Sequence, residues 1–228
     1  MIDLSLKLST KMLRAQWVHG EPVILKLTDE HEVEVLRRLH GNQSTKRTHI
    51  IPLVDVVDGR LIVLPKRTPL TQFLVLDAMG DEVGVLAAQF MEGVEYLQQS
   101  SVAHLDLKPD NIVVQRDPES KEVDLALIDF DIAVFADVEP TISRSNGTPG
   151  WCAPEISAEK SYDPLLADRW SCGRVLSFLT DRMKPGLPRE KMRLWSHQLM
   201  NPNPSLRPRI SDLRDLRPPE MTLIPSTV

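Results

Sequence analysis

The segment from His104 to Asn111 constrains this chain more than any other stretch of its sequence. It places a carboxylate at Asp106, an ammonium group at Lys108 and a carboxamide at Asn111. If a loop holds them on one face, Asp106 could accept a proton from a hydroxyl, Lys108 could neutralise a phosphate and Asn111 could bind Mg²⁺. Read alone, the segment is also compatible with a polar turn, because Asp, Lys, Pro and Asn are common in turns.

The residues that follow predict a β-hairpin. Two apolar runs, 112–114 and 123–128, flank a polar stretch, which is the pattern of two strands joined by a turn. The second run ends at Asp129, so the hairpin would bring Asp129 close to Asn111. Two oxygen ligands at one place suit Mg²⁺, which binds few protein groups and keeps its other positions for phosphate and water. The hairpin therefore favours a chemical role for the segment over a simple turn.

These residues resemble two motifs of eukaryotic-type protein kinases. The catalytic loop of that family reads His-Arg-Asp-Leu with an Asn further on, and its metal-binding motif reads Asp-Phe-Gly. This chain has Leu105 in place of the Arg and Asp131 in place of the Gly. The match covers most of residues 22–212. Three further segments match in the family's order, namely Gly147–Glu155, which ends in Ala-Pro-Glu, Asp168–Gly173 and Asn201–Pro208.

The resemblance implies an α+β, two-lobed protein kinase-like fold with a reduced β-rich N-lobe and a mainly helical C-lobe. It divides the chain into an N-lobe at 1–67, a C-lobe at 68–217 and a tail at 218–228. The implied activity is transfer of the γ-phosphoryl group of ATP, with Mg²⁺, to a hydroxyl of a protein substrate. The serine/threonine branch is inferred from Leu107-Lys108-Pro109 alone.

Each candidate site residue takes its role from the matching motif position. Asp106 is expected to be the catalytic base, and Lys108 is expected to stabilise charge. Asn111 and Asp129 are the expected metal ligands. Lys26 resembles the lysine of the family's Val-Ala-Ile-Lys strand, which grips the nucleotide phosphates. The expected cofactor-binding residues are Lys26, Glu32, Ile24, Leu64 and Pro65.

A helix is expected over residues 29–40, and Glu32 falls on its apolar stripe with Val35, Leu36 and Leu39. A carboxylate that faces the interior needs a cation, so we predict that Glu32 pairs with Lys26.

The N-terminal 21 residues contain one glycine, Gly20, where the family has a glycine-rich phosphate loop. Larger side chains hinder the close approach of backbone N–H groups to phosphate. Residues 12–18 are expected to form a strand that turns at 19–20, and the strand before it is expected to be missing or rudimentary. In addition, Ile24 replaces the small alanine that lies against adenine in the family.

These departures leave two other functions open. The first is a pseudokinase, a binding or scaffold module with weak or no phosphoryl transfer. The second is a small-molecule phosphotransferase, which shares the His-x-Asp-x-x-x-x-Asn spacing. The matches at Glu155, Asp168 and Arg207 speak against the second.

The remaining elements are expected to be structural. A hairpin is predicted from 50–57 and 61–64 with its turn at Asp58-Gly59, followed by a hinge at 65–69 and an amphipathic helix that ends near Gln99. The three histidines His31, His40 and His49 show no metal-ligand spacing and are expected at the surface, whereas Trp170, Leu176 and Leu179 are expected in the core.

The resemblance also assigns supporting contacts. Thr148 is expected beside the catalytic base, Glu155 is expected to pair with Arg207, and Asp168 is expected to bind the backbone of the catalytic loop. The usual Arg at position 105 binds a phosphate on the activation segment, so Leu105 predicts activity without phosphorylation of that segment. The hydroxyls concerned are Thr141, Ser143 and Ser145.

Charge and composition narrow the partners. A net charge of -5 offers no basic stripe for nucleic acid, and no apolar run reaches the roughly 18 residues that a membrane span needs. The two cysteines, Cys152 and Cys172, fit a reducing compartment and buried thiols without a disulfide. The expected location is therefore intracellular and most simply cytoplasmic, and the oligomeric state stays open.

Overall fold

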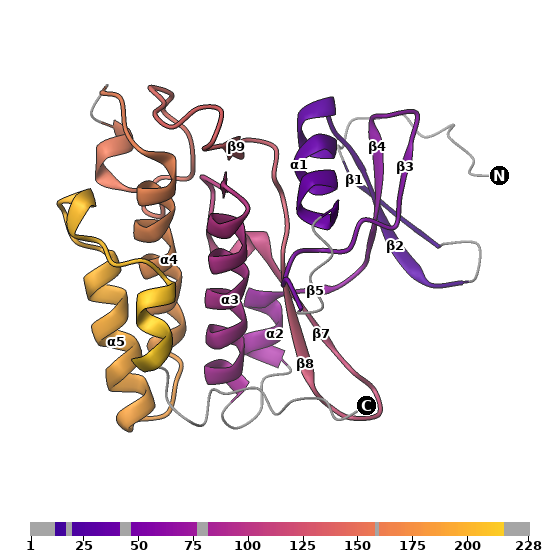
Figure 1. The fold of residues 1–228 in the computed structure, drawn as a ribbon. Coiled ribbons are helices and arrows are strands. Elements are labelled where there is room, and N and C mark those ends of the chain that lie inside the picture. The colour runs from indigo at the N-terminus through magenta and orange to yellow at the C-terminus, as the bar shows by residue number, and fades with distance from the viewer. Residues whose placement is uncertain (1–11, 17–19, 42–46, 77–81, 158–159, 217–228) are drawn as a thin grey trace.

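The chain folds into a β-rich lobe and a helical lobe, as the two sides of Figure 1 show. The computed structural model describes residues 12–16, 20–41, 47–76, 82–157 and 160–216. The β-rich lobe contains a four-stranded antiparallel sheet in the order β1-β2-β4-β3. Its elements are β1 (Met12–Gln16), β2 (Pro22–Leu27), α1 (Glu30–Gly41), β3 (Asp55–Val57) and β4 (Leu61–Pro65).

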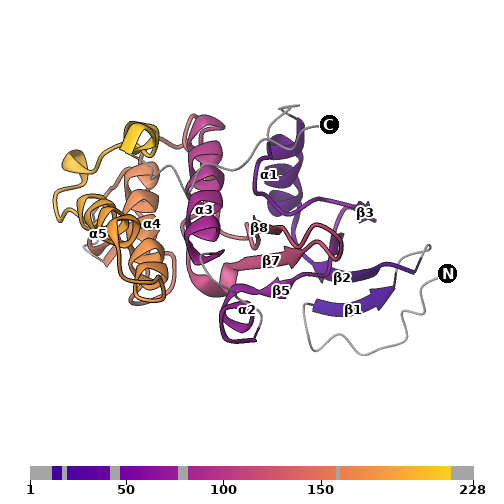
Figure 2. The same ribbon diagram turned by 90° about the horizontal axis from the view of Figure 1, so that it is seen from below.

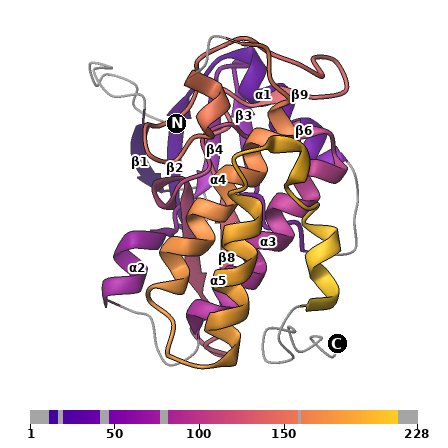
Figure 3. The ribbon, with the colours of Figure 1, turned by 90° about the vertical axis from the view of Figure 1, so that its left-hand side faces the viewer.

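The helical lobe begins at β5 (Thr68–Pro69) and α2 (Leu70–Leu76). Helix α3 lies between α4 and the β7–β8 hairpin in Figures 1 and 2, and nearly all of its apolar residues are buried there. Helices α4 and α5 run side by side on the face turned away from the sheet (Figure 3). The other elements are α3 (Glu82–Gln99), β6 (Val102–Ala103), a 3-10 turn (Pro109–Asn111), β7 (Ile112–Arg116), β8 (Val123–Leu127), β9 (Val134–Phe135), a second 3-10 turn (Pro154–Ser157), α4 (Pro164–Thr180), α5 (Leu187–Leu199) and two final 3-10 turns (Pro204–Leu206 and Ser211–Leu216).

Strand β2 directs its side chains alternately to the two faces of the sheet, as the period of two in a strand requires. Val23 and Leu25 are buried against Val63 on one face. Ile24 and Lys26 occupy the other face, which looks into the space between the lobes. This alternation places the predicted nucleotide-binding side chains of β2 on the cleft side.

Helix α1 confirms the expected helix with a shift of one residue at each end. Asp29 Oδ1 accepts a hydrogen bond from the backbone N–H of Glu32 over 3.1 Å, which satisfies one of the unpaired donors at the helix N-terminus. Glu32 is buried together with the apolar stripe, whereas Glu30 and Glu34 are exposed. Glu32 therefore faces the interior, where it requires a cation.

Both predicted hairpins are present, but one is shorter than expected. The β7–β8 hairpin pairs Ile112 with Leu127, and β3 joins β4 through a turn in which Asp58 and Gly59 both have positive φ. The prediction of a strand over 50–57 is wrong for its first part. Residues 49–51 instead bond to Leu127 of β8, because the backbone of that segment meets the hairpin of the other lobe.

Burial corrects three further predictions. His49 is only 4% exposed, so the surface assignment is wrong for this residue, which packs against Gly93 of α3. Trp170 is partly buried instead of being in the core, and the Arg207 guanidinium lies 5.2 Å from its ring centre. Both cysteines are free, but Cys152 is only partly buried.

The N-terminal and C-terminal predictions are tested only in part. Strand β1 covers residues 12–16 of the expected strand, and Gly20 has the positive φ of a turn. Residues 17–19 and the tail at 218–228 lie outside the described residues. The same holds for the residues before 12, where the first strand is expected to be missing or rudimentary. Six residues, 181–186, connect α4 to α5.

Candidate active site

Asp106 lies in a hydrogen-bond network that fixes its carboxylate. Thr148 Oγ1 donates to Asp106 Oδ1 over 2.6 Å, which confirms the predicted contact, and Lys108 Nζ donates to Oδ2 over 2.6 Å. Asn111 Nδ2 donates to the same Oδ2 over 2.9 Å. Each carboxylate oxygen has two lone pairs. Among the described residues Oδ1 receives this one donor, so it keeps a lone pair that can accept a proton.

Asp168 of α4 binds the backbone of the catalytic loop that contains Asp106. Its carboxylate accepts hydrogen bonds from the N–H of His104 over 2.5 Å and from the N–H of Leu105 over 2.8 Å, as predicted. Leu105 has φ 64, a left-handed conformation that costs a branched residue about 1–2 kcal/mol. The two hydrogen bonds help to hold this strained conformation and thus the position of Asp106.

His104 is a packed, neutral residue. Its Nε2 lies 3.0 Å from the backbone oxygen of Ile128 and must donate there, while Nδ1 accepts from the N–H of Asp106 over 3.3 Å. The ring also packs against Phe130 at 4.8 Å between centroids. Complete burial lowers the pKa of His104. The ring therefore links the catalytic loop to the residue after Asp129 without carrying a positive charge.

The burial of Asp168 predicts a pH dependence of stability. Burial raises the pKa of Asp168 from 3.8 to about 7, although the two backbone N–H groups oppose this shift. The folded state therefore binds the proton more tightly than the unfolded chain, so the associated stability is present below about pH 4 and is lost as the pH rises to about 7. Relative to Asp168→Asn, the free energy of unfolding of the unmodified chain should fall by up to roughly 4 kcal/mol over that range.

Urea unfolding of both proteins at several pH values tests this prediction. The Asn variant supplies the control because its amide does not titrate in this range, and parallel profiles for the two proteins would contradict the prediction.

Lys26 is surrounded by three carboxylates. Its Nζ lies 2.7 Å from Glu32 Oε1, which confirms the predicted pair, 2.6 Å from Asp129 Oδ1 and 2.8 Å from Asp131 Oδ1. Burial disfavours the charged amine most strongly, but Glu32 and Asp129 outweigh it and raise the pKa of Lys26. Burial and the neighbouring Asp131 carboxyl raise the pKa of Glu32. Lys26 is therefore a fixed positive charge.

The motif that contains Asp129 has a left-handed backbone at its first residue. Asp129 itself has φ 69, whereas Asp131 is absent from the described residues with positive φ. The Asp131 side chain points to Lys26, and the Phe130 N–H donates to Glu32 Oε1 over 3.1 Å.

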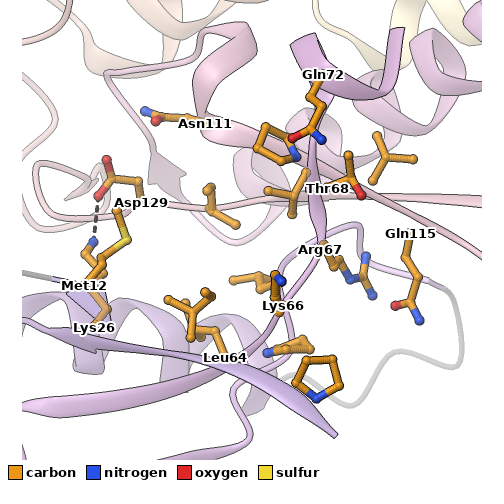
Figure 4. Close-up of a pocket in the computed structure, with 18 of the residues that line it drawn as sticks. Met12, Lys26, Leu64, Lys66, Arg67, Thr68, Gln72, Asn111, Gln115 and Asp129 are labelled. Carbon is orange, nitrogen blue, oxygen red and sulfur yellow. Dashed lines mark hydrogen bonds and ion pairs between the residues drawn. The ribbon is translucent and has the colours of Figure 1, made fainter. Parts of the chain in front are cut away.

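A cavity of about 1010 Å³ opens between the two lobes beside Lys26 and Asp129 (Figure 4). Six of the predicted site residues line it together, which places β2, β4 and the β7–β8 hairpin around one space. Asp106, Lys108 and Glu32 do not line the cavity. Asp106 is joined by a hydrogen bond to Asn111, and Glu32 is joined to Lys26, and both of these partners do line it. The six residues are Ile24, Lys26, Leu64, Pro65, Asn111 and Asp129.

Several lining residues were not identified from the sequence. They come from β1, from the crossing between the lobes and from α2 and β7, which contain no motif of the family. Only the tertiary arrangement brings them to the same cavity. They include Met12, Arg14, Lys66, Arg67, Gln72 and Gln115.

The chemistry of the cavity fits a nucleotide with a divalent cation. Ile24 and Leu64 face each other across the paired strands and offer an apolar surface for a base. Lys26 offers a positive charge for phosphate. Asn111 uses its Nδ2 to bind Asp106, which leaves its Oδ1 as a metal ligand, and Asp129 supplies a carboxylate. Both ligand types are oxygen donors, which Mg²⁺ prefers.

The activation segment is held by apolar packing. Leu105 is 1% exposed and belongs to a cluster with Ile142 and Tyr162. Ile142 and Tyr162 also exchange two backbone hydrogen bonds of 2.9 Å. A side chain at Gly147 would come within 2.7 Å of the Leu105 carbonyl oxygen, so the segment also approaches the catalytic loop closely. These contacts order the segment without a phosphate.

This packing supports the prediction that phosphorylation is not required. Thr141, Ser143 and Ser145 are exposed, and Leu105 cannot bind a phosphate on them. A triple alanine variant should keep the turnover of the unmodified chain, measured as label transferred from ATP per unit time. A large loss of turnover in this variant would refute the prediction, and Ile142→Ala, which removes the apolar contact, should reduce turnover instead.

Glu155 and Arg207 form the predicted buried ion pair. Two hydrogen bonds of 2.5 Å and 2.8 Å join the guanidinium to both carboxylate oxygens. The Arg207 side chain is fully buried and also donates to the backbone oxygens of Leu166 and Asn201. The pair ties the end of the activation segment to the helical lobe.

Comparison with known proteins identifies the family. The family model described as protein kinase domain matches residues 26–213, which is most of the chain. The chain belongs to the protein kinase family. The two-lobed fold predicted from the motifs is confirmed.

The kinase is similar to CBL-interacting protein kinases of plants. It is 33% identical to CBL-interacting protein kinase 22 of Oryza sativa subsp. japonica over 66% of this chain and 35% of the relative. It is 30% identical to CBL-interacting serine/threonine-protein kinase 3 of Arabidopsis thaliana over 70% of this chain and 39% of the relative. The chain thus spans well under half of these relatives. None of the helices in the described part of the chain is long and apolar enough to cross a membrane.

Proposed function

We propose that this kinase transfers the γ-phosphoryl group of ATP to a serine or threonine hydroxyl of a protein, with Mg²⁺ as the second cofactor. The observation that carries the proposal is the convergence of Lys26, Asn111 and Asp129 on one cavity, with Asp106 joined to Asn111 by a 2.9 Å hydrogen bond. We further propose that the N-lobe ends and the C-lobe begins at the 67/68 boundary, between β4 and β5.

In the proposed reaction each residue of the chain has a distinct task. Asp106 Oδ1 accepts the proton of the acceptor hydroxyl, while Thr148 and Lys108 hold the carboxylate in position. Lys26 orients the phosphates, and Glu32 keeps its ammonium group in place. When bound, ATP supplies the phosphoryl group and Mg²⁺, held by Asn111 and Asp129, offsets its negative charge.

The crossing between the lobes limits how a base can bind. Pro65 has no N–H, and the N–H of Lys66 donates to the Pro22 carbonyl over 3.0 Å. Neither residue can therefore donate to a base. We propose that Pro65 contributes its carbonyl oxygen and that the backbone donor comes from Arg67 or Thr68, which also line the cavity.

A pseudokinase that binds or scaffolds other proteins is the second candidate. The observation that favours it is Ile24, a large side chain in the wall of the cavity where the family has alanine. The lack of a glycine-rich segment in residues 1–21 points the same way. Both features weaken nucleotide binding without disturbing the residues around Asp106.

Thermal stability and phosphoryl transfer separate the two candidates. At a hundredfold excess of ATP and Mg²⁺ over the Kd, the free energy of unfolding should rise by about 2.7 kcal/mol. Label from ATP should then appear on the kinase or on a generic protein substrate. Stabilisation without transfer would favour the pseudokinase, and no stabilisation would contradict nucleotide binding altogether.

A further inference from the structure

Asp131 occupies the third hydrogen-bond position of the Lys26 ammonium group. An ammonium group has three N–H donors. In this kinase Glu32, Asp129 and Asp131 each accept from Lys26 Nζ, over 2.7, 2.6 and 2.8 Å. The three carboxylates thus use the full donor capacity of Lys26. A phosphate oxygen can bind this ammonium only when one carboxylate moves away.

The three carboxylates are not equally able to move. Glu32 is 1% exposed and is fixed by hydrogen bonds from Thr28 Oγ1 and from the Phe130 N–H. The Asp129 and Asp131 side chains are 39% and 34% exposed, so both can turn toward solvent. Asp129 has a proposed role as metal ligand, so Asp131 is the partly exposed carboxylate that a phosphate can displace from Lys26.

The negative charge of the three carboxylates opposes the binding of a phosphate beside Lys26. Three carboxylate groups lie within hydrogen-bonding distance of one positive charge, and ligand oxygens of all three lie within 4.8 Å of one another. A phosphate that displaces Asp131 brings further negative charge next to this group. Like charges a few ångströms apart repel one another, even where the effective dielectric constant is about 20. A divalent cation that arrives with the phosphates offsets this repulsion.

We propose that Asp131 is a positioning residue that occupies Lys26 in place of a nucleotide phosphate and thereby makes phosphate binding depend on a divalent cation. This inference rests on the proposed function, because it concerns ATP in the cavity beside Lys26. A glycine at position 131, as in the family's motif, would leave the third donor of Lys26 to the phosphate. The kinase would then bind ATP with less need for the cation.

Calorimetric titration of the whole chain tests the proposal with three ligands. These are ATP with a chelator, ATP with Mg²⁺, and adenosine, which has no phosphate. Asp131→Asn keeps the size of the side chain and removes its charge, so it should bind metal-free ATP about tenfold more tightly. The gain in affinity for ATP with Mg²⁺ should be smaller, and the affinity for adenosine should not change.

Two matched variants serve as controls. Asp131→Glu retains the carboxylate and should keep the weak binding of metal-free ATP. Asp58→Asn removes one carboxylate from an exposed turn of the β3–β4 hairpin, at φ 50, which asparagine tolerates. It should behave like the unmodified chain with all three ligands, which excludes an effect of net charge alone.

The outcomes distinguish this inference from the proposed function. If the unmodified chain binds ATP with Mg²⁺ but Asp131→Asn binds metal-free ATP no more tightly, the role of Asp131 is refuted and the proposed function stands. Weaker binding of ATP with Mg²⁺ by Asp131→Asn, or an equal gain for adenosine, would also refute the role. If neither protein binds ATP or adenosine, both the proposed function and the inference fail.

Discussion

An Asp106→Asn variant should lose about 10²- to 10⁴-fold in turnover, which is the contribution of a positioned general base. The physical reason is that asparagine cannot accept a proton from the attacking hydroxyl. Its amide can still occupy the network formed by Thr148, Lys108 and Asn111, so the loop should keep its shape. The measurement is the initial rate of label transfer from ATP to a generic protein at saturating nucleotide.

The control for this variant is Asp58→Asn, the same chemical change on an exposed turn far along the chain. It should keep full turnover. Asp106→Asn should also keep the stabilisation by ATP, because Asp106 is not in the wall of the cavity. Unchanged turnover in Asp106→Asn would refute its role as base, and loss of nucleotide binding would point to a collapsed loop instead.

A Glu155→Ala variant should lose about 3–5 kcal/mol of unfolding free energy. The substitution leaves the fully buried guanidinium of Arg207 without its carboxylate partner. Domains of this size are stable by only about 5–15 kcal/mol, so the loss is a large fraction of the total. Urea unfolding at constant pH measures it, provided that the slope with urea is the same for both proteins.

The chain contains a matched surface pair for comparison. Glu139 and Arg144 are also joined by a salt bridge, but both side chains are more than half exposed. Glu139→Ala should therefore cost no more than about 1 kcal/mol, because solvent screens exposed ion pairs. Equal losses in Glu155→Ala and Glu139→Ala would contradict the view that burial makes the Glu155–Arg207 pair important.

The sequence predicted those contacts that follow from motif order and local periodicity. The helical spacing around Glu32 indicated an inward-facing carboxylate, and the adjacent strand contained Lys26 as its cation. The Asp58-Gly59 dipeptide predicted a tight turn because both positions need positive φ. The contacts of Asp168 and of Glu155 with Arg207 followed from resemblance, since neither their spacing nor their composition reveals a contact.

Other features could not be read from local patterns. Residues 49–51 have the composition of a strand, but their partner is β8, more than 70 residues further along the chain. His49 is buried for the same reason, because the approach of this segment to Gly93 depends on the packing of the two lobes. Asp131 was recognised as a departure from the family, but its contact with Lys26 depends on the path of the backbone after Asp129.

The amino-acid sequence by itself determined the family, the order of the elements and the identity of the groups that carry charge around Asp106 and Lys26. These depend on residue types and on periodicities within one helix or strand. Only the tertiary structure decided that three carboxylates share the Lys26 ammonium group and that β1, the lobe crossing and α2 complete the cavity wall. Such contacts join residues up to about a hundred positions apart, and their geometry is set by how the lobes pack.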